Sequence, residues 1–308
     1  MKRSLIVFFS ILVLTFSLIT AFAGTTTYPL SVVDDSNTLV VINSEPQKIV
    51  STAPANTEIL FYLGFGNKVV GVTDYADYPP QVKSITRIGQ MAPLNKEKIA
   101  LLDPDVIFAT GGFQTKGVEG LRKLGFTVIV VDPKNFDGMF KDIVLVSVVM
   151  GDPDVGKKKV KELNDRLMKV AKSAYNIPID KRPKVLVGGE YKDIWAPGAG
   201  SFLNEAISLA GGRNITGRLI GPSGWLPINP EFVVMNDPDI IIIPEGKAMG
   251  TGKARDKVIS FVTHRPGWGN IKAVKNKHIY FVDENILYRP GPRLVDAVEL
   301  LNKYFFKK

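Results

Sequence analysis

The chain has 308 residues, of which 45% are hydrophobic and 22% charged, and this balance excludes an intrinsically disordered protein. Its length allows one large domain or two smaller ones. The formal net charge of +9 includes short lysine clusters, typical of solvated helix faces, so we expect no nucleic-acid partner. The lack of cysteine excludes a disulfide framework and thiolate metal sites.

Residues 1–23 have the composition of a secretory signal peptide. Lys2 and Arg3 form a positive start, an apolar run follows, and "AFA" at residues 21–23 supplies a cleavage pattern. We therefore expect cleavage before Gly24, with an uncleaved membrane anchor as the alternative. Because no cysteine follows the signal, we expect a soluble periplasmic protein without a lipid anchor.

The first half of the chain alternates short strands with helices. Residues 28–43 predict two strands around a turn, and "KIVS" at residues 48–51 predicts a buried strand before a helix that starts near Pro54. Further buried strands are predicted at residues 68–72, 105–110 and 127–132. This alternation predicts a mostly parallel sheet with helices on both faces.

The middle of the chain changes to helical periodicity. One apolar stripe on a charged helix is formed by Val160, Leu163, Leu167, Val170 and Ala174. A helix of about 20 residues would reach about 30 Å, enough to bridge two lobes. We therefore expect an interdomain helix over residues 151–178, between an N-terminal lobe of residues 24–150 and a C-terminal lobe of residues 179–308.

Two segments of the chain are nearly the same. "NKEKIALLDPDVIFAT" begins at Asn95, and "NPEFVVMNDPDIIIIP" begins at Asn229. A strand precedes each segment, and each is followed by a strand that ends at an aspartate, Asp132 or Asp283. The fold class predicted from this duplication is α/β, with two similar lobes, each a mostly parallel sheet flanked by helices, joined by one long helix.

The repeated segment has the features of a helix start. Asn95 and Asn229 are good N-cap residues, and Glu97 and Glu231 fall in the first turn, where the helix dipole favours a negative charge. An Asp-Pro pair follows each helix and is expected to end it, because the residue before proline avoids the helical region.

Several stretches resemble the periplasmic binding proteins of ABC importers for cobalamin and ferric siderophores. They are "APANTEILFYLGFGNKVVGVTDYADYPP", the two Asn-x-Glu elements, "APGAGSFLNEAISLAGGRNIT" and "RPGPRLVDAVELL". The resemblance runs from about Tyr28 to the C-terminus. It implies a bilobal monomer without enzymatic activity or a cofactor of its own. Such a protein holds a metal chelate, either a cobalt corrinoid or a ferric siderophore with haem least favoured, and delivers it to a permease dimer in the inner membrane.

The resemblance also implies roles for individual residues. Glu97 and Glu231, one in each lobe, would dock against arginines of the permease, although helix dipoles alone could explain both acids. The candidate ligand-binding residues are Tyr75, Trp195, Trp225, Tyr288 and Arg289. Aromatic side chains suit a large flat ligand, and the arginine suits a carboxylate, phosphate or amide oxygen. Of these, Tyr75, Trp225 and Arg289 match ligand-contacting positions of the similar proteins, whereas Trp195 rests on its loop context alone.

The alternative reading is a periplasmic hydrolase or metal-handling enzyme on a duplicated α/β scaffold. Glu97 and Glu231 could then act as acid and base. The near-matches "GAGSF" and "GPSGW" lack the last glycine of a nucleophile elbow. His264 and His278 are too few for a zinc site, whereas a haem ligand through His264 or a tyrosine stays open.

Overall fold

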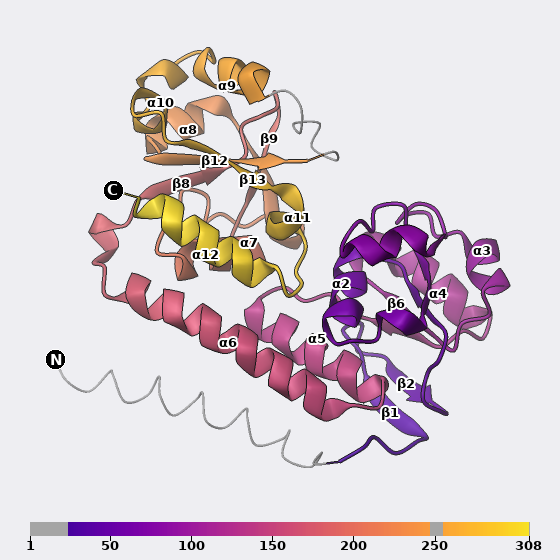
Figure 1. Cartoon of the computed structure of the whole chain (residues 1–308). Coiled ribbons are helices and arrows are strands. Elements are labelled where there is room, and N and C mark those ends of the chain that lie inside the picture. The colour runs from indigo at the N-terminus through magenta and orange to yellow at the C-terminus, as the bar shows by residue number, and fades with distance from the viewer. Residues whose placement is uncertain (1–23, 247–254, 308) are drawn as a thin grey trace.

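The computed structural model describes residues 24–246 and 255–307, so the predicted signal peptide lies outside the described residues. Figure 1 shows two lobes side by side, with a long helix, α6, running beneath both of them. No helix within the two described ranges has both the length and the apolar character of a membrane span.

The first lobe is built on a parallel sheet with the strand order β5-β4-β3-β6-β7. An antiparallel hairpin precedes it. The strands are β1 (Leu30–Val33), β2 (Leu39–Ile42), β3 (Ile49–Ser51), β4 (Val69–Val72), β5 (Thr86–Arg87), β6 (Val106–Ala109) and β7 (Val128–Val130). The helices are α2 (Pro54–Tyr62), η2 (Gly66–Lys68), η3 (Pro80–Ser84), α3 (Lys96–Leu101), η4 (Gly112–Gln114), α4 (Thr115–Lys123) and α5 (Phe136–Val149).

The second lobe has a parallel sheet with the order β10-β8-β12-β13 and a separate antiparallel pair, β11-β9. The strands are β8 (Lys184–Val187), β9 (Ile194–Pro197), β10 (Arg213–Asn214), β11 (Trp225–Ile228), β12 (Ile240–Glu245) and β13 (Ile279–Asp283). The helices are η5 (Ile179–Lys181), α7 (Phe202–Leu209), η6 (Pro222–Gly224), α8 (Pro230–Asn236), α9 (Arg255–Thr263), η7 (Trp268–Asn270), α10 (Lys272–Lys275), α11 (Glu284–Tyr288) and α12 (Leu294–Phe305). The predicted α/β class with two similar lobes is confirmed.

Helix α6 (Pro153–Tyr175) packs against α5 of the first lobe and against α7 and α12 of the second. Leu163 and Leu167 on its predicted apolar stripe are buried. The approach to α5 is close, because a Cβ at Gly156 would lie 2.0 Å from Ser147 Oγ. On the other side Arg166 donates hydrogen bonds to two carboxylates of α12, Asp296 and Glu299. Helix α6 is therefore fixed to both lobes.

Buried apolar side chains form one large shared core and two smaller outer cores. The shared core joins α2 and α5 of the first lobe, α6, and α7 and α12 of the second. The outer core of the first lobe contains Ile99 of α3, and that of the second lobe contains Val233 of α8. Both α3 and α8 lie on the side of their lobe that faces away from α6 (Figure 1).

The repeated segments adopt the same local structure. The predicted caps are confirmed, because Asn95 Oδ1 accepts a hydrogen bond at 2.9 Å and Asn229 Oδ1 accepts one at 2.7 Å, each from the backbone N–H three residues on. The prediction that the residue before each proline avoids the right-handed helical region is confirmed. Asp103 and Asp237, each just past its helix, both have a φ of 47°, in the left-handed region that aspartate tolerates. This left-handed residue ends each helix before the proline is reached.

A second matched contact ties each segment to its neighbouring strand. Asp105 Oδ2 accepts a hydrogen bond from the backbone N–H of Lys48 at 2.8 Å, and Asp239 Oδ2 accepts one from Lys184 at 2.8 Å. The backbone N–H of each aspartate donates in return to the carbonyl of the same lysine. The second aspartate of the Asp-Pro-Asp motif therefore sets the register of the strand that follows.

Candidate functional site

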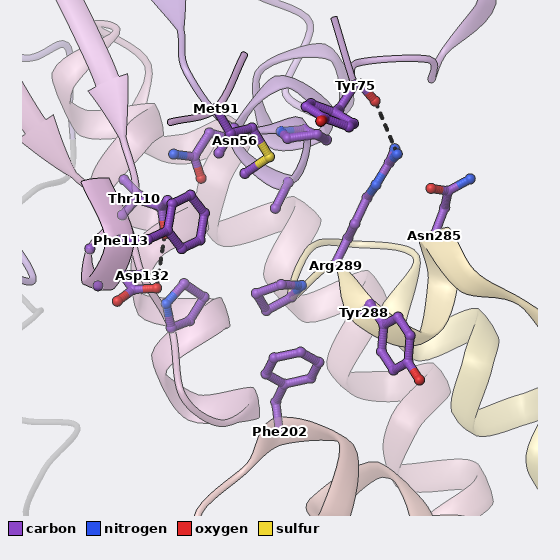
Figure 2. Close-up of a pocket in the computed structure, with 18 of the residues that line it drawn as sticks. Asn56, Tyr75, Met91, Thr110, Phe113, Asp132, Phe202, Asn285, Tyr288 and Arg289 are labelled. Carbon is purple, nitrogen blue, oxygen red and sulfur yellow. Dashed lines mark hydrogen bonds between the residues drawn. The ribbon is translucent and has the colours of Figure 1, made fainter. Parts of the chain in front are cut away.

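The two lobes face each other across a cleft of about 950 Å³. The cleft lies beyond the carboxyl ends of the sheet strands, where open α/β sheets bind ligands, and its size suits a small molecule. In Figure 2, Met91, Thr110 and Phe113 lie on one side, and Asn285, Tyr288 and Arg289 lie on the other. The lining residues with aromatic or charged side chains are Tyr75, Asp74, Asp77, Phe113, Asp132, Lys134, Phe202, Trp225, Glu284, Tyr288 and Arg289.

The wall from the second lobe is a packed group of three aromatic rings. Trp225, the first residue of β11, contacts Tyr288 edge-on at a centroid distance of 5.3 Å and Phe202 at 6.4 Å. Burial, and to a smaller extent Glu190 and Glu284, raises the pKa of Tyr288, so this phenol stays neutral. The three rings form an apolar surface, and such surfaces stack on flat ligands.

Phe202 is the member of this group that the sequence analysis missed. It is the first residue of α7, directly after the N-cap Ser201, whose hydroxyl accepts a hydrogen bond from the backbone N–H of Asn204. A helix that starts beyond a strand end turns its first side chains toward the cleft. A serine directly before an apolar helical stretch is a typical N-cap, so the position after Ser201 was a usable signal for Phe202.

The wall from the first lobe is more open. Tyr75 follows β4, and its hydroxyl donates to Gln90 Oε1 at 2.6 Å. Phe113 lies in η4 and is 64% exposed. Behind them the buried Gln114 bonds to the backbone of Thr52 and Met91 and holds this wall in place. The first lobe thus offers two aromatic side chains with exposed faces.

Arg289 lines the cleft, and its guanidinium is directed at the first lobe. Its Nη1 donates to Glu58 at 3.0 Å and to Asp77 at 2.6 Å, and its Nη2 donates to the Tyr75 carbonyl at 3.1 Å (Figure 2). In this structure the arginine therefore joins the two lobes.

The partner of Arg289 in this joint could not be predicted from the sequence. Glu58, on α2, is 3% exposed and also accepts two hydrogen bonds from Arg293, at 2.8 and 2.6 Å. The Arg293 guanidinium lies 4.0 Å from the centre of the Tyr78 ring. A buried carboxylate is stable only when it is paired in this way. Glu58 lies among apolar residues in the sequence of α2. The periodicity of that sequence does not indicate which arginines Glu58 contacts.

Both cationic residues of the lining are paired with carboxylates. Lys134 Nζ bonds to Asp132 at 2.5 Å, and the Thr110 hydroxyl donates to the other oxygen of Asp132 at 2.9 Å. Arg289 is held by Glu58 and Asp77. Among the described lining residues, no lysine or arginine is left without an acidic partner.

Trp195 is the one predicted ligand-binding residue that does not line the cleft. It lies in β9, opposite Pro227 of β11, and 56% of it is exposed. The expected loop around Trp195 and Trp225 is in fact this antiparallel pair. The register pairs Trp225 with Pro197 and Trp195 with Pro227, so the two tryptophans lie two positions apart along the pair, and only Trp225 reaches the lining.

Glu97 and Glu231 lie outside the cleft, in the first turns of α3 and α8, and both are exposed. His264 and His278 are also exposed. In residues 24–246 and 255–307, no three histidine, aspartate or glutamate side chains gather as a metal site would require.

Comparison with known proteins identifies the family. A family model described as "Periplasmic binding protein" matches residues 49–286. The chain belongs to the periplasmic binding protein family. This binding protein is 33% identical to an uncharacterized ABC transporter substrate-binding lipoprotein, YvrC of Bacillus subtilis, over 90% of this chain and 85% of that one. It is 31% identical to a vitamin B12-binding protein of Vibrio cholerae, over 84% of this chain and 88% of that one.

A solved structure agrees with these relatives. The crystal structure of the periplasmic vitamin B12 binding protein BtuF of Vibrio cholerae matches this binding protein with a TM-score of 0.70 and 29% identity, over 85% of this chain and 97% of that one. The resemblance predicted from the sequence is confirmed. Neither the family nor these relatives support the hydrolase alternative.

Proposed function

We propose that this chain is the substrate-capture component of an ABC importer and that it binds one metal chelate in the interlobe cleft. The ligand is a cobalt corrinoid or a ferric siderophore, with haem least favoured. The observation that carries this proposal is the aromatic wall of Phe202, Trp225 and Tyr288 in a cleft between two lobes of a periplasmic binding protein. The chain performs no chemistry on the ligand and needs no cofactor.

The charges of the cleft support a ligand without free carboxylates. Lys134 and Arg289 are occupied by acidic partners, whereas Asp74 adds negative charge to the lining. A ligand such as haem, with two carboxylates, would have to displace one of these pairs at a cost in free energy. An amide-rich corrinoid or an uncharged hydroxamate chelate needs no such exchange. The names of the relatives from Vibrio cholerae favour the corrinoid.

We also propose that Glu97 and Glu231 dock this chain, as a monomer in the periplasm, onto a permease dimer. Support comes from their exposure and from their equivalent positions in the two lobes. YvrC is named a lipoprotein, whereas this sequence contains no cysteine that could carry a lipid, so we expect a soluble form.

Titration by visible absorption, with native mass spectrometry for stoichiometry, tests the ligand class. The probes are cyanocobalamin, ferrioxamine B and haemin. We expect a one-to-one complex with cyanocobalamin or ferrioxamine B, with a Kd below about 1 µM, and weaker binding of haemin. Trp225→Ala should weaken the complex, whereas Trp195→Ala, outside the lining, should leave it unchanged. No stoichiometric complex with any of the three probes would contradict the proposal.

A further inference from the structure

Two large apolar side chains near the proposed docking glutamates are exposed to solvent. Leu101, the last residue of α3, is 85% exposed, and Met235 of α8 is 78% exposed. Single exposed apolar residues are common on protein surfaces and need no explanation. These two differ because they occupy the same place in the two lobes.

The equivalence follows from the repeated segment. Leu101 is six residues after its N-cap Asn95, and Met235 is six residues after its N-cap Asn229. Each is four residues after the glutamate of its lobe. Side chains four residues apart in a helix lie on one face, about 5–6 Å apart between Cβ atoms. Each lobe therefore presents one acid and one apolar side chain together.

The inward side of each helix is fixed as well. Ile99 and Val233, two residues after the glutamates, are fully buried in the outer cores of their lobes. Their burial holds the opposite face of each helix toward solvent. Neither Leu101 nor Met235 contributes to a core of the described residues, so the folded chain gains little from an apolar side chain at these positions.

We propose that Glu97 with Leu101 and Glu231 with Met235 form two equivalent contact points for the two subunits of the permease dimer. This inference rests on the proposed docking role of the two glutamates and adds the apolar half of the interface. A partner built from two alike subunits offers the same site twice, and this surface presents the same pair of side chains twice. Each site on the permease would place a guanidinium or ammonium group beside an apolar pocket.

The two members of each pair act on different steps of docking. Exposed charges steer the encounter, so the glutamates set the association rate and its dependence on salt. A side chain that leaves water only in the complex slows dissociation. Burial of one leucine or methionine changes affinity by about tenfold or more.

The test measures the binding of the ligand-free chain to the ABC permease of its source organism, held in nanodiscs, by biolayer interferometry. The variants are Leu101→Ser with Met235→Ser, and Glu97→Gln with Glu231→Gln. The matched control is Leu124→Ser with Ile220→Ser, which removes two exposed apolar side chains elsewhere on the surface. Unfolding midpoints in guanidinium show that all variants keep their fold.

The variant with both Leu101→Ser and Met235→Ser should dissociate at least tenfold faster than the native chain. Its association rate and the salt dependence of that rate should change little. The variant with both Glu97→Gln and Glu231→Gln should associate more slowly, and the control variant should match the native chain in both rates. If the Leu101 and Met235 pair behaves like the control while the glutamate pair weakens docking, the apolar half is wrong and the docking role stands. If neither pair differs from the control, both proposals for this surface fail, whatever chelate the cleft binds.

Discussion

In the first lobe β4, β3, β6 and β7 lie side by side, and in the second lobe β10, β8, β12 and β13 lie in the corresponding order. The segments that contain Asn95 and Asn229 also share their caps, their left-handed aspartates and their strand contacts. The walls of the cleft differ. The second lobe presents packed aromatic rings, whereas the first presents exposed ones. The shared sheets therefore supply the frame, and we expect the loops and the added β9–β11 pair to determine ligand selectivity.

The largest effect is expected where the lobes are most alike. Replacing Glu97 and Glu231 together by arginine should abolish chelate uptake by cells, because two like charges would face the cations expected on the permease. The cyanocobalamin or ferrioxamine B affinity of the purified variant should stay native, since both residues lie outside the cleft. Loss of chelate affinity in the purified double variant would contradict the equivalence of the two docking points.

The difference between the cleft walls predicts unequal losses of affinity. Trp225→Ala should weaken chelate binding by about a hundredfold, because its ring is held in place by Phe202 and Tyr288. Phe113→Ala, on the open wall, should weaken it by about tenfold or less. Titration of both variants with the same chelate checks this order. Equal losses would show that the two walls contribute alike.

The sequence predicted the elements of this fold well because strand and helix periods are local. The caps at Asn95 and Asn229 and the stripe on α6 all depend on neighbours within a few residues. The joint between the lobes was not predicted. Glu58 meets Arg289 and Arg293 more than 230 positions away, and only the packed fold brings them together. The pairing of β9 with β11 was not predicted either, and its register places Trp195 two positions from Trp225 along the pair, outside the lining.

The hairpin β1–β2 gives the first lobe a pH-sensitive contact. Its turn carries Asp35, which lies close to Asp142 on the buried side of α5. Burial, reinforced by Asp35, raises the pKa of Asp142 to about 8. Neither Asp142 oxygen has a hydrogen-bond partner among the described residues, and Lys141 Nζ lies 3.5 Å away. The unfolded carboxyl loses its proton near pH 4, about four pH units earlier. Between pH 4 and pH 8 the Asp142 carboxyl is protonated in the folded state and ionised in the unfolded state. The free energy of unfolding therefore falls as pH rises from 4 to 8.

Asp142→Asn should remove this pH dependence. Guanidinium unfolding at pH 5 and pH 9 should show that the native chain loses about 2 kcal/mol relative to the variant, the usual cost of an uncompensated buried polar group. A parallel fall in both proteins would mean that the slope arises elsewhere.

The smallest effects should separate the two left-handed aspartates. Glycine adopts this backbone conformation without strain. Asp103→Gly should change the free energy of unfolding by less than about 0.5 kcal/mol, because within the described residues the Asp103 side chain bonds only to the exposed Lys48 side chain. Asp237→Gly should destabilise by about 1 kcal/mol, since the Lys272 N–H would lose its acceptor. Urea unfolding of both variants measures the contrast, and an identical result for the two would remove it.

The shared apolar core has a consequence for how the molecule can be divided. Helix α6 buries its apolar stripe against helices of both halves. Cutting the chain after Tyr175 or before Pro153 would therefore expose a large apolar surface to solvent on either fragment. Heat should therefore melt the protein in one cooperative step, and a chelate held by residues of both halves should raise that single melting temperature.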